Sequence, residues 1–316
     1  MSGRKNGSPR PVPGHVQAGI RVDFFIVGAP KAGTTWLYRN IGRSPDLFVA
    51  ANKEPRYFSV EDGAEVAFVG PGDDSWMGHF VRSRADYEAL FDGAGEGRLR
   101  GEASSDYLYT SAVAAPRIRR ECPAARIIVM LRDPVHRAYS NWLHHRRDGR
   151  EPLPFGAALD AEEERIGAGW AWWWHYRERG WYSRQLEPFL EHFPADQILL
   201  LRHDDLRRDP QGLLRRVGDF LEVDVLADGD LLRGRNESVL VRSPFHRTVR
   251  RVARPNAVAR ALLPRPVRAT LRRRVDRGTL HKPTIPPEDY RRLRRFYAAD
   301  IERLAGMVDL DLSEWG

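Results

Sequence analysis

Residues 22–37 read VDFFIVGAPKAGTTWL and contain the pattern from which the fold is best predicted. Apart from Asp23, residues 22–27 are apolar and rich in branched and aromatic side chains, which is typical of a buried β-strand. The run ends at Gly28-Ala29-Pro30, which favours a turn, and residues 34–41 then show helical spacing. A strand, a glycine-rich loop and a helix in this order direct the N–H groups of the first helical turn toward the loop. This arrangement suits an anion.

A second strand and helix are predicted further along the chain. Residues 126–131 form another apolar run, Arg132-Asp133-Pro134 interrupts it, and residues 135–147 have helical spacing with Pro134 in the first turn. A third strand is expected at 197–201. Further helices are expected at 180–193, 210–221 and 287–307. Strands that alternate with helices predict an α/β fold in one domain, with a central parallel sheet flanked by helices and a P-loop-like strand-loop-helix nucleotide site. Irregular insertions are expected at 60–85, 148–178 and 225–285.

The glycine loop differs from that of nucleoside-triphosphate enzymes. Those enzymes carry G-x-x-x-x-G-K-[ST], whereas here Gly28 and Gly33 keep the spacing but Thr34 follows and the lysine stands at position 31. From inside the loop, Lys31 reaches a first phosphate and the atom that bridges it to the next group. No strand ends in an obvious Mg²⁺-binding aspartate. The loop therefore favours a 5′-phosphate that carries a transferable group, without a metal.

With these residues in place, the loop G-A-P-K-A-G-T-T-W-L resembles the 5′-phosphosulfate loop of sulfotransferases that use 3′-phosphoadenosine 5′-phosphosulfate (PAPS). Residues 132–140 likewise resemble the family's 3′-phosphate motif, R-[DN]-P-x-x-R-x-x-S. The resemblance implies that Arg132 and Ser140 hold the 3′-phosphate. It implies that the 5′-phosphosulfate is held by Lys31, Ala32, Gly33, Thr34, Thr35 and Trp36.

Four further stretches resemble a branch of this family that acts on heparan sulfate, together with related bacterial enzymes. They are K-E-P-R-Y-F at 53–58, G-E-A-S-S-D-Y-L at 101–108, G-W-Y-S-R-Q-L at 180–186 and the end of the chain at 309–315. The resemblance implies that Glu54 is the general base, that Lys31 stabilises the leaving phosphate and that Tyr182 lies near the adenine. It also makes Lys282 a candidate for the 3′-phosphate. The product would be adenosine 3′,5′-bisphosphate.

Two positions depart from the branch. Ala103 stands where relatives have a lysine, and Arg56 stands where heparan-type relatives often have a histidine. We hypothesise that Arg56 replaces the missing charge. Candidate acceptor-binding residues are Lys53, Arg56, Ser104, Trp172 and Trp173. The tryptophans belong to the run W-A-W-W-W at 170–174, whose rings either line an acceptor cleft or pack on the domain.

The composition bounds the remaining possibilities. The chain has 316 residues, of which 42% are hydrophobic, and a net charge of +8, so it buries a real core and favours anionic partners. The single cysteine, Cys122, excludes an internal disulfide and a thiolate metal site. Residues 1–20 read as a flexible polar tail before a sulfotransferase domain at 21–316, and neither a signal peptide nor a transmembrane segment is expected. A cytoplasmic location fits these features.

Two other functions remain open. The first is a P-loop small-molecule kinase, which Lys31's position disfavours. The second is a protein that binds an anionic polymer or a membrane through residues 242–277, where twelve arginines accompany one acidic residue. No nucleic-acid-binding signature is present, so nucleic acid is not expected. The expected acceptor is a hydroxyl of a carbohydrate or a secondary metabolite, with an amine as a less favoured alternative. The arginine- and alanine-rich composition indicates a high-GC bacterium, which favours a metabolite.

Overall fold

The computed structural model describes residues 20–225, 231, 240–241, 280–281 and 283–315. Apart from Ile20, the predicted tail lies outside the described residues, as do the arginine-rich stretch 242–277 and Lys282.

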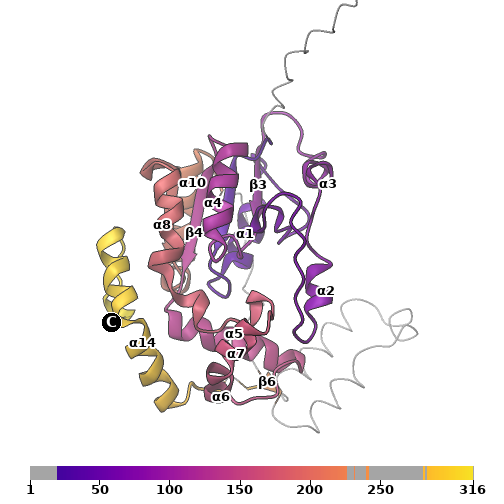
Figure 1. Cartoon of the computed structure of the whole chain (residues 1–316). Helices are drawn as coiled ribbons and strands as arrows, with labels where there is room; N and C mark the ends of the chain where they lie inside the picture. The colour runs from indigo at the N-terminus through magenta and orange to yellow at the C-terminus, as the bar shows by residue number, and fades with distance from the viewer. Residues whose placement is uncertain (1–19, 226–230, 232–239, 242–279, 282, 316) are drawn as a thin grey trace, which may run out of the picture.

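A five-stranded parallel sheet forms the centre of the molecule (Figure 1). Its strands are β1 (Phe24–Gly28), β2 (Leu47–Val49), β3 (Leu99–Ala103), β4 (Arg126–Leu131) and β5 (Ile198–Arg202). Their order is β2-β3-β1-β4-β5, with every neighbouring pair parallel. The predicted α/β class is therefore confirmed. β2 and β3 are additions to the three strands that were expected.

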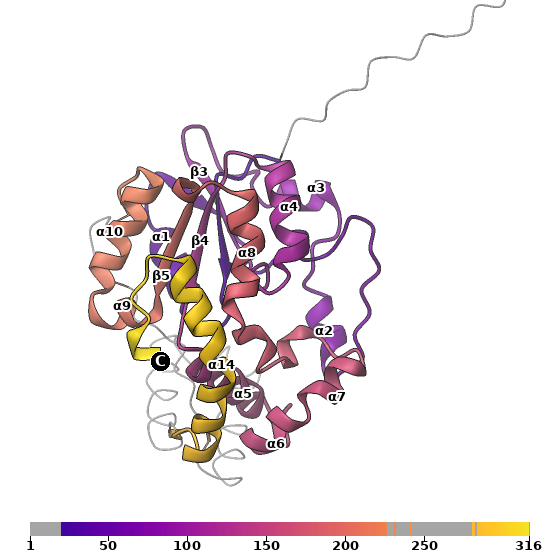
Figure 2. The same ribbon diagram turned by 60° about the vertical axis from the view of Figure 1, so that its left-hand side comes forward.

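Helices cover both faces of the sheet (Figure 2). The longer ones are α1 (Thr34–Ile41), α4 (Ser111–Glu121), α5 (Pro134–Asp148), α8 (Tyr182–His192), α10 (Pro210–Leu221) and α14 (Pro287–Met307). The shorter ones are α2 (Asp73–Met77), α3 (Arg84–Ala89), α6 (Phe155–Asp160), α7 (Glu162–Gly167) and α9 (His203–Arg208). α4 and α8 lie on one face, because the crossovers from β3 to β4 and from β4 to β5 advance in the same direction and such crossovers are right-handed. α14 packs on the outer side of α8. The crossover from β1 to β2 runs the opposite way and places α1 on the other face. There, the Ser44 hydroxyl donates to the Asp224 carbonyl at 2.6 Å and joins the end of α1 to the end of α10.

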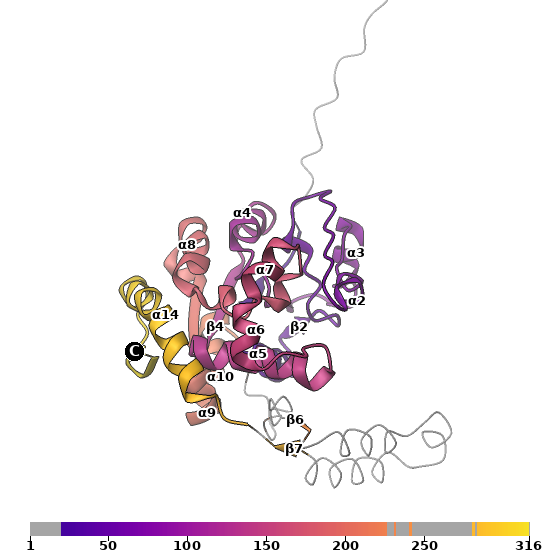
Figure 3. The same ribbon diagram turned by 60° about the horizontal axis from the view of Figure 1, so that its bottom comes forward.

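A separate two-stranded antiparallel pair consists of β6 (Leu240–Val241) and β7 (Leu280–His281). It lies near the start of α14 (Figure 3). Among the described helices, none combines the length and the apolar character that a membrane span requires.

The carboxyl ends of β1 and β4 are neighbours at the point where the strand order reverses. From β1 the chain moves outward to β2 and β3, then returns to β4 on the other side of β1. Open α/β sheets bind ligands at such a point. The Ala29 N–H donates to the Met130 carbonyl at 2.7 Å, so the loop after β1 lies beside the loop after β4. The two sequence motifs therefore meet at one edge of the sheet.

Candidate active site

The loop between β1 and α1 places a lysine in an unusual setting. Lys31 has a positive φ of 68°, and Gly33 has φ 103° directly before the first helical residue, Thr34. The φ of Gly33 is strained for any residue with a side chain, so the turn favours glycine there, and a Cβ atom would also lie 2.8 Å from the Leu206 side chain. Burial first, and then the charges of Arg147 and Arg132, lower the pKa of Lys31 to about 7. The loop thus holds a cation that would gain from an anionic partner.

Arg132 contacts this loop directly. Its Nη1 donates to the Lys31 carbonyl at 3.0 Å, and the Tyr182 hydroxyl donates to the Arg132 carbonyl at 2.8 Å. Burial also lowers the pKa of the Arg132 guanidinium. Within the described part of the chain, neither Lys31 nor Arg132 forms an ion pair with a carboxylate. Two poorly compensated cations at the end of the sheet form a candidate site for an anion.

Ser140 lies on α5, directly after the Arg132 loop. The Asp133 side chain accepts from the His136 N–H at 2.9 Å and caps this helix, and Ser140 is 5% exposed. Ser140, His144 and Arg147 share one helix face because they are four and three residues apart. Burial lowers the pKa of His144, and the charge of Lys31 lowers it too, while the charge of Arg147 lowers the pKa of Lys31, so the second half of α5 lies within electrostatic range of the loop. The structure therefore brings Arg132 into contact with the Lys31 loop, and it places Ser140 on the helix that begins directly after Arg132 and Asp133.

Arg147 is a further candidate site residue, which the sequence motifs did not include. It is the largest charged contributor to the lowered pKa of Lys31. The sequence feature that could have pointed to Arg147 is its distance of seven residues from Ser140, which places both on one face of a helix.

Glu54 occupies a well-defined position beside the end of β3. Its carboxylate accepts from the Ser105 N–H at 2.8 Å and from the Ser105 hydroxyl at 3.0 Å, and it forms an ion pair with Lys53. Its own N–H donates to the Ala103 carbonyl at 2.8 Å, and its side chain is 18% exposed. These contacts fix the orientation of the carboxylate while leaving part of it accessible. A base that takes a proton from a bound hydroxyl needs both properties.

Arg56 is held in place by the protein itself. Its Nε forms an ion pair with Asp106, its Nη1 donates to the Glu54 carbonyl at 3.0 Å, and its guanidinium lies 4.9 Å from the Trp76 ring centroid. The Arg56 N–H also donates to the Ser104 hydroxyl at 3.0 Å. Only 3.8 Å separates Arg56 Nη2 from the Glu54 carboxylate. Arg56 and Ser104 therefore support the segment that carries Glu54, and whether Arg56 also touches a substrate stays a prediction.

Backbone strain is concentrated in these two segments. Among the described residues, four non-glycine residues have a positive φ, and three of them are Lys31 (68°), Glu54 (67°) and Arg56 (57°). Left-handed backbone is unfavourable for such residues, and it persists where the surroundings enforce it, often at functional sites. The conformation of both loops is thus set by their surroundings.

A second carboxyl group lies inside the protein behind Glu54. Glu102 on β3 is fully buried and accepts from the Tyr107 hydroxyl at 2.8 Å and the Tyr87 hydroxyl at 3.0 Å. Burial raises the pKa of Glu102 to about 7. Because no part of Glu102 is exposed, it supports the end of β3 and does not meet a ligand directly.

The tryptophan run packs mainly on the protein. Trp172 is 8% exposed and its ring centroid lies 5.2 Å from that of Trp76, while Trp173 stacks on Trp76 at 5.5 Å. The buried Asp73 carboxylate accepts from the indole N–H groups of Trp173 at 2.6 Å and Trp174 at 3.0 Å. Packing thus accounts for Trp172 and Trp174. Trp173, which is partly exposed and lies under the Arg150 guanidinium at 4.8 Å, is the ring of the three best placed to meet an acceptor.

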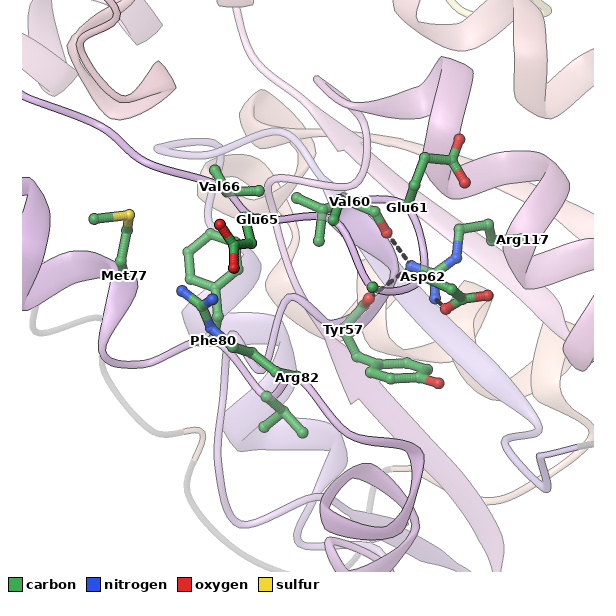
Figure 4. A pocket seen from close by; sticks show the side chains of 13 residues that line it. Tyr57, Val60, Glu61, Asp62, Glu65, Val66, Met77, Phe80, Arg82 and Arg117 are labelled. Carbon is green, nitrogen blue, oxygen red and sulfur yellow. Dashed lines mark hydrogen bonds and ion pairs between the residues drawn. The ribbon is translucent and has the colours of Figure 1, made fainter.

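A pocket of about 180 Å³ lies next to the segment that carries Glu54 (Figure 4). Its lining consists of Tyr57, residues 60–66, Met77, residues 80–82 and Arg117, and none of the residues predicted for the nucleotide or for catalysis belongs to it. Phe80 lines the pocket and also lies 5.5 Å from the Arg56 guanidinium. The pocket is therefore distinct from the anion site at the end of the sheet. No cluster of three or more potential metal ligands occurs among the described residues.

A glycine loop at the switch point of an α/β sheet, with a lysine that has no carboxylate partner among the described residues, is typical of proteins that bind phosphorylated ligands. A model of the sulfotransferase family matches residues 23–228, and the chain belongs to this family.

Similar proteins agree with this assignment. The chain is 31% identical over 210 residues to the bifunctional heparan sulfate N-deacetylase/N-sulfotransferase 1 of Xenopus laevis, a match that covers 63% of this chain and 22% of that protein. It is 30% identical over 197 residues to mouse heparan sulfate glucosamine 3-O-sulfotransferase 3A1, covering 62% and 44%, respectively. The chain thus matches less than half the length of these relatives. The crystal structure of a sulfotransferase from Alicyclobacillus acidocaldarius superposes with a TM-score of 0.73 at 31% identity, covering 93% of this chain and 98% of that one. The predicted resemblance to heparan-type and bacterial sulfotransferases is confirmed.

Proposed function

We propose that the protein transfers the sulfuryl group of PAPS to an acceptor hydroxyl. The observation that carries this proposal is the 3.0 Å contact between Arg132 Nη1 and the Lys31 carbonyl. It joins two half-buried cationic residues that have no carboxylate partner among the described residues. A nucleotide with anionic groups at both its 5′ and 3′ positions fits two such cations.

The binding roles divide between the two loops. Lys31 and the residues at the start of α1 would hold the 5′-phosphosulfate through N–H groups, hydroxyls and one ammonium; these residues are Ala32, Gly33, Thr34, Thr35 and Trp36. Arg132 and Ser140 would hold the 3′-phosphate. Tyr182, proposed to lie near the adenine, is 1% exposed, and its hydroxyl is engaged by the Arg132 carbonyl. Its proposed contribution is therefore chiefly to the position of Arg132.

The transfer itself would need few protein groups. When bound, PAPS supplies the sulfur atom and an adenosine 3′,5′-bisphosphate leaving group. Glu54 takes the proton of the acceptor hydroxyl as its oxygen bonds to sulfur, and the bond between sulfur and the 5′-phosphate oxygen breaks. Lys31 stabilises the negative charge on that phosphate oxygen. Because side-chain cations supply the positive charge, we propose no metal.

The acceptor is proposed by class only. The two relatives named above act, by their names, on heparan sulfate, which supports an oligosaccharide acceptor; a microbial secondary metabolite is the other candidate. Lys53 and Trp173 are the partly exposed candidates on the acceptor side. We propose that the reaction takes place in the cytoplasm.

Ligand binding and donor use test this proposal together. We expect adenosine 3′,5′-bisphosphate to bind more tightly than adenosine 5′-monophosphate by about tenfold to a hundredfold, because charged hydrogen bonds to the second phosphate contribute roughly 1.5–3 kcal/mol. Calorimetry with both nucleotides measures the difference. Radiolabelled transfer from PAPS to a panel of sugars and phenols should continue in the presence of EDTA. Transfer of a phosphoryl group from ATP in a reaction that requires Mg²⁺ would favour the small-molecule kinase. If both nucleotides bind equally weakly and heparin binds tightly and in a salt-sensitive way, the protein that binds an anionic polymer is favoured.

A further inference from the structure

A buried carboxylate on the C-terminal helix caps another helix of the site. Asp300 on α14 accepts from the Tyr182 N–H at 2.8 Å and the Ser183 N–H at 3.2 Å, and also from the Ser183 hydroxyl. These groups form the first turn of α8. Residue 181, which precedes the turn, is a tryptophan and provides no side-chain cap. A carboxylate at this position satisfies unpaired N–H groups and favours the positive end of the helix dipole.

The hydrogen bonds continue from this cap to the nucleotide loops. Tyr182, whose N–H bonds Asp300, donates its hydroxyl to the Arg132 carbonyl at 2.8 Å. Arg132 in turn donates to the Lys31 carbonyl at 3.0 Å. The Trp315 ring packs against the Tyr182 ring with their centroids 6.2 Å apart. One connected path therefore runs from α14 to both loops of the anion site.

A second contact links the same helix to the same motif. Arg294 on α14 forms an ion pair at 3.3 Å with Asp133, whose carboxylate also caps α5. Figure 2 shows α14 lying across α8 and close to α5. The family match ends at residue 228, so α14 lies beyond the part of the chain that it covers. The helix nevertheless holds both Arg132, through Tyr182, and the start of the helix that carries Ser140.

We propose that Asp300 is a positioning residue for recognition of the 3′-phosphate, acting through the first turn of α8 and the Tyr182 hydroxyl on Arg132. The proposal rests on the proposed function, in which Arg132 binds that phosphate. Fixing the Arg132 carbonyl fixes the start of its side chain, so that less conformational freedom is lost when the guanidinium binds an anion. Without the cap, Arg132 remains present but is less well oriented.

The test compares two nucleotides that differ only in the 3′-phosphate. Calorimetry gives the Kd of adenosine 3′,5′-bisphosphate and of adenosine 5′-monophosphate for the full chain, for Asp300→Asn and for Tyr182→Phe. Glu302→Gln is the matched control because Glu302 is an exposed acid on the same helix. In both variants we expect the preference for the bisphosphate to fall by about fivefold to tenfold, since one or two hydrogen bonds of ordinary strength are lost, while the Kd of the monophosphate stays unchanged. In an Arg132→Ala background, Asp300→Asn should cause no further change in preference.

The outcomes separate failure of the proposed function from failure of the positioning role of Asp300. If the unmodified protein does not prefer the bisphosphate, the proposed function fails. If it does prefer it, and both variants keep that preference as Glu302→Gln does, the positioning role is overturned. An equal loss for both nucleotides also overturns it, because that result indicates general loosening. Should Asp300→Asn fail to fold, Tyr182→Phe decides, since it removes only the hydroxyl.

Discussion

Replacing Glu54 with glutamine should lower kcat for sulfuryl transfer by about 10²–10⁴-fold, the usual contribution of a general base. The substitution keeps the shape of the side chain. It also keeps one carbonyl oxygen that can accept from the Ser105 N–H, which lies 2.8 Å from the Glu54 carboxylate in the unmodified protein. What it removes is the ability to take a proton. The Kd of adenosine 3′,5′-bisphosphate should stay within about twofold of the unmodified value, because the nucleotide loops do not depend on this proton transfer.

The measurement is a single-turnover rate with saturating PAPS and an acceptor found by the labelling panel. Glu163→Gln provides the control, since Glu163 is an exposed glutamate on α7. A melting temperature that is equal in both variants and the unmodified chain shows that the fold is intact. If Glu54→Gln retains more than about a tenth of the activity with that fold, another group is the base.

The strands that could be predicted from the sequence are those whose apolar runs match their buried position in the sheet. β1, β4 and β5 are apolar runs because parallel strands are covered on both faces, and Phe24, Ile127 and Val129 are indeed fully buried. β3 lacks such a run, as it reads Leu-Arg-Gly-Glu-Ala. Its place depends on contacts distant in sequence: a Cβ on Gly101 would collide with the Phe24 ring, and one Glu102 oxygen accepts a hydrogen bond from the Tyr87 hydroxyl.

The same distinction applies to the site. Lys31 and Arg132 could be predicted because each stands in a motif with a local geometry, a strand end followed by a helix. Asp106 and Asp300 could not, because their roles are defined by partners more than forty residues away, such as Arg56 for Asp106 and Tyr182 for Asp300. A sequence pattern does not reveal which distant group a buried carboxylate will satisfy. The arrangement of α14 over α8 is known only from the structure.

Lys31→Ala should lower kcat by about 10²–10³-fold, the usual effect of removing one group that stabilises charge on a leaving oxygen. It should also change the pH dependence of nucleotide binding. The pKa of Lys31 in the free protein is about 7, lowered by burial and by Arg147 and Arg132. An anionic ligand favours the protonated ammonium and raises this pKa, so that binding takes up a proton. The affinity for adenosine 3′,5′-bisphosphate should therefore be greatest below about pH 7 and fall by up to about tenfold per pH unit above it.

Calorimetry between about pH 7.5 and 9 measures this fall, in a range where the nucleotide phosphates, which titrate near pH 6, no longer change their charge. Repeating each point in buffers of different ionisation enthalpy gives the number of protons taken up. Lys31→Arg should flatten the profile while keeping much of the affinity, because a guanidinium stays charged throughout, and Lys31→Ala should flatten it at lower affinity. Arg39→Ala, which removes an exposed cation from α1, the helix after the Lys31 loop, should retain the slope of the unmodified protein. If Lys31→Arg keeps the slope of the unmodified protein, a group other than Lys31 takes up the proton. That group would then also be the cation that neutralises the leaving phosphate.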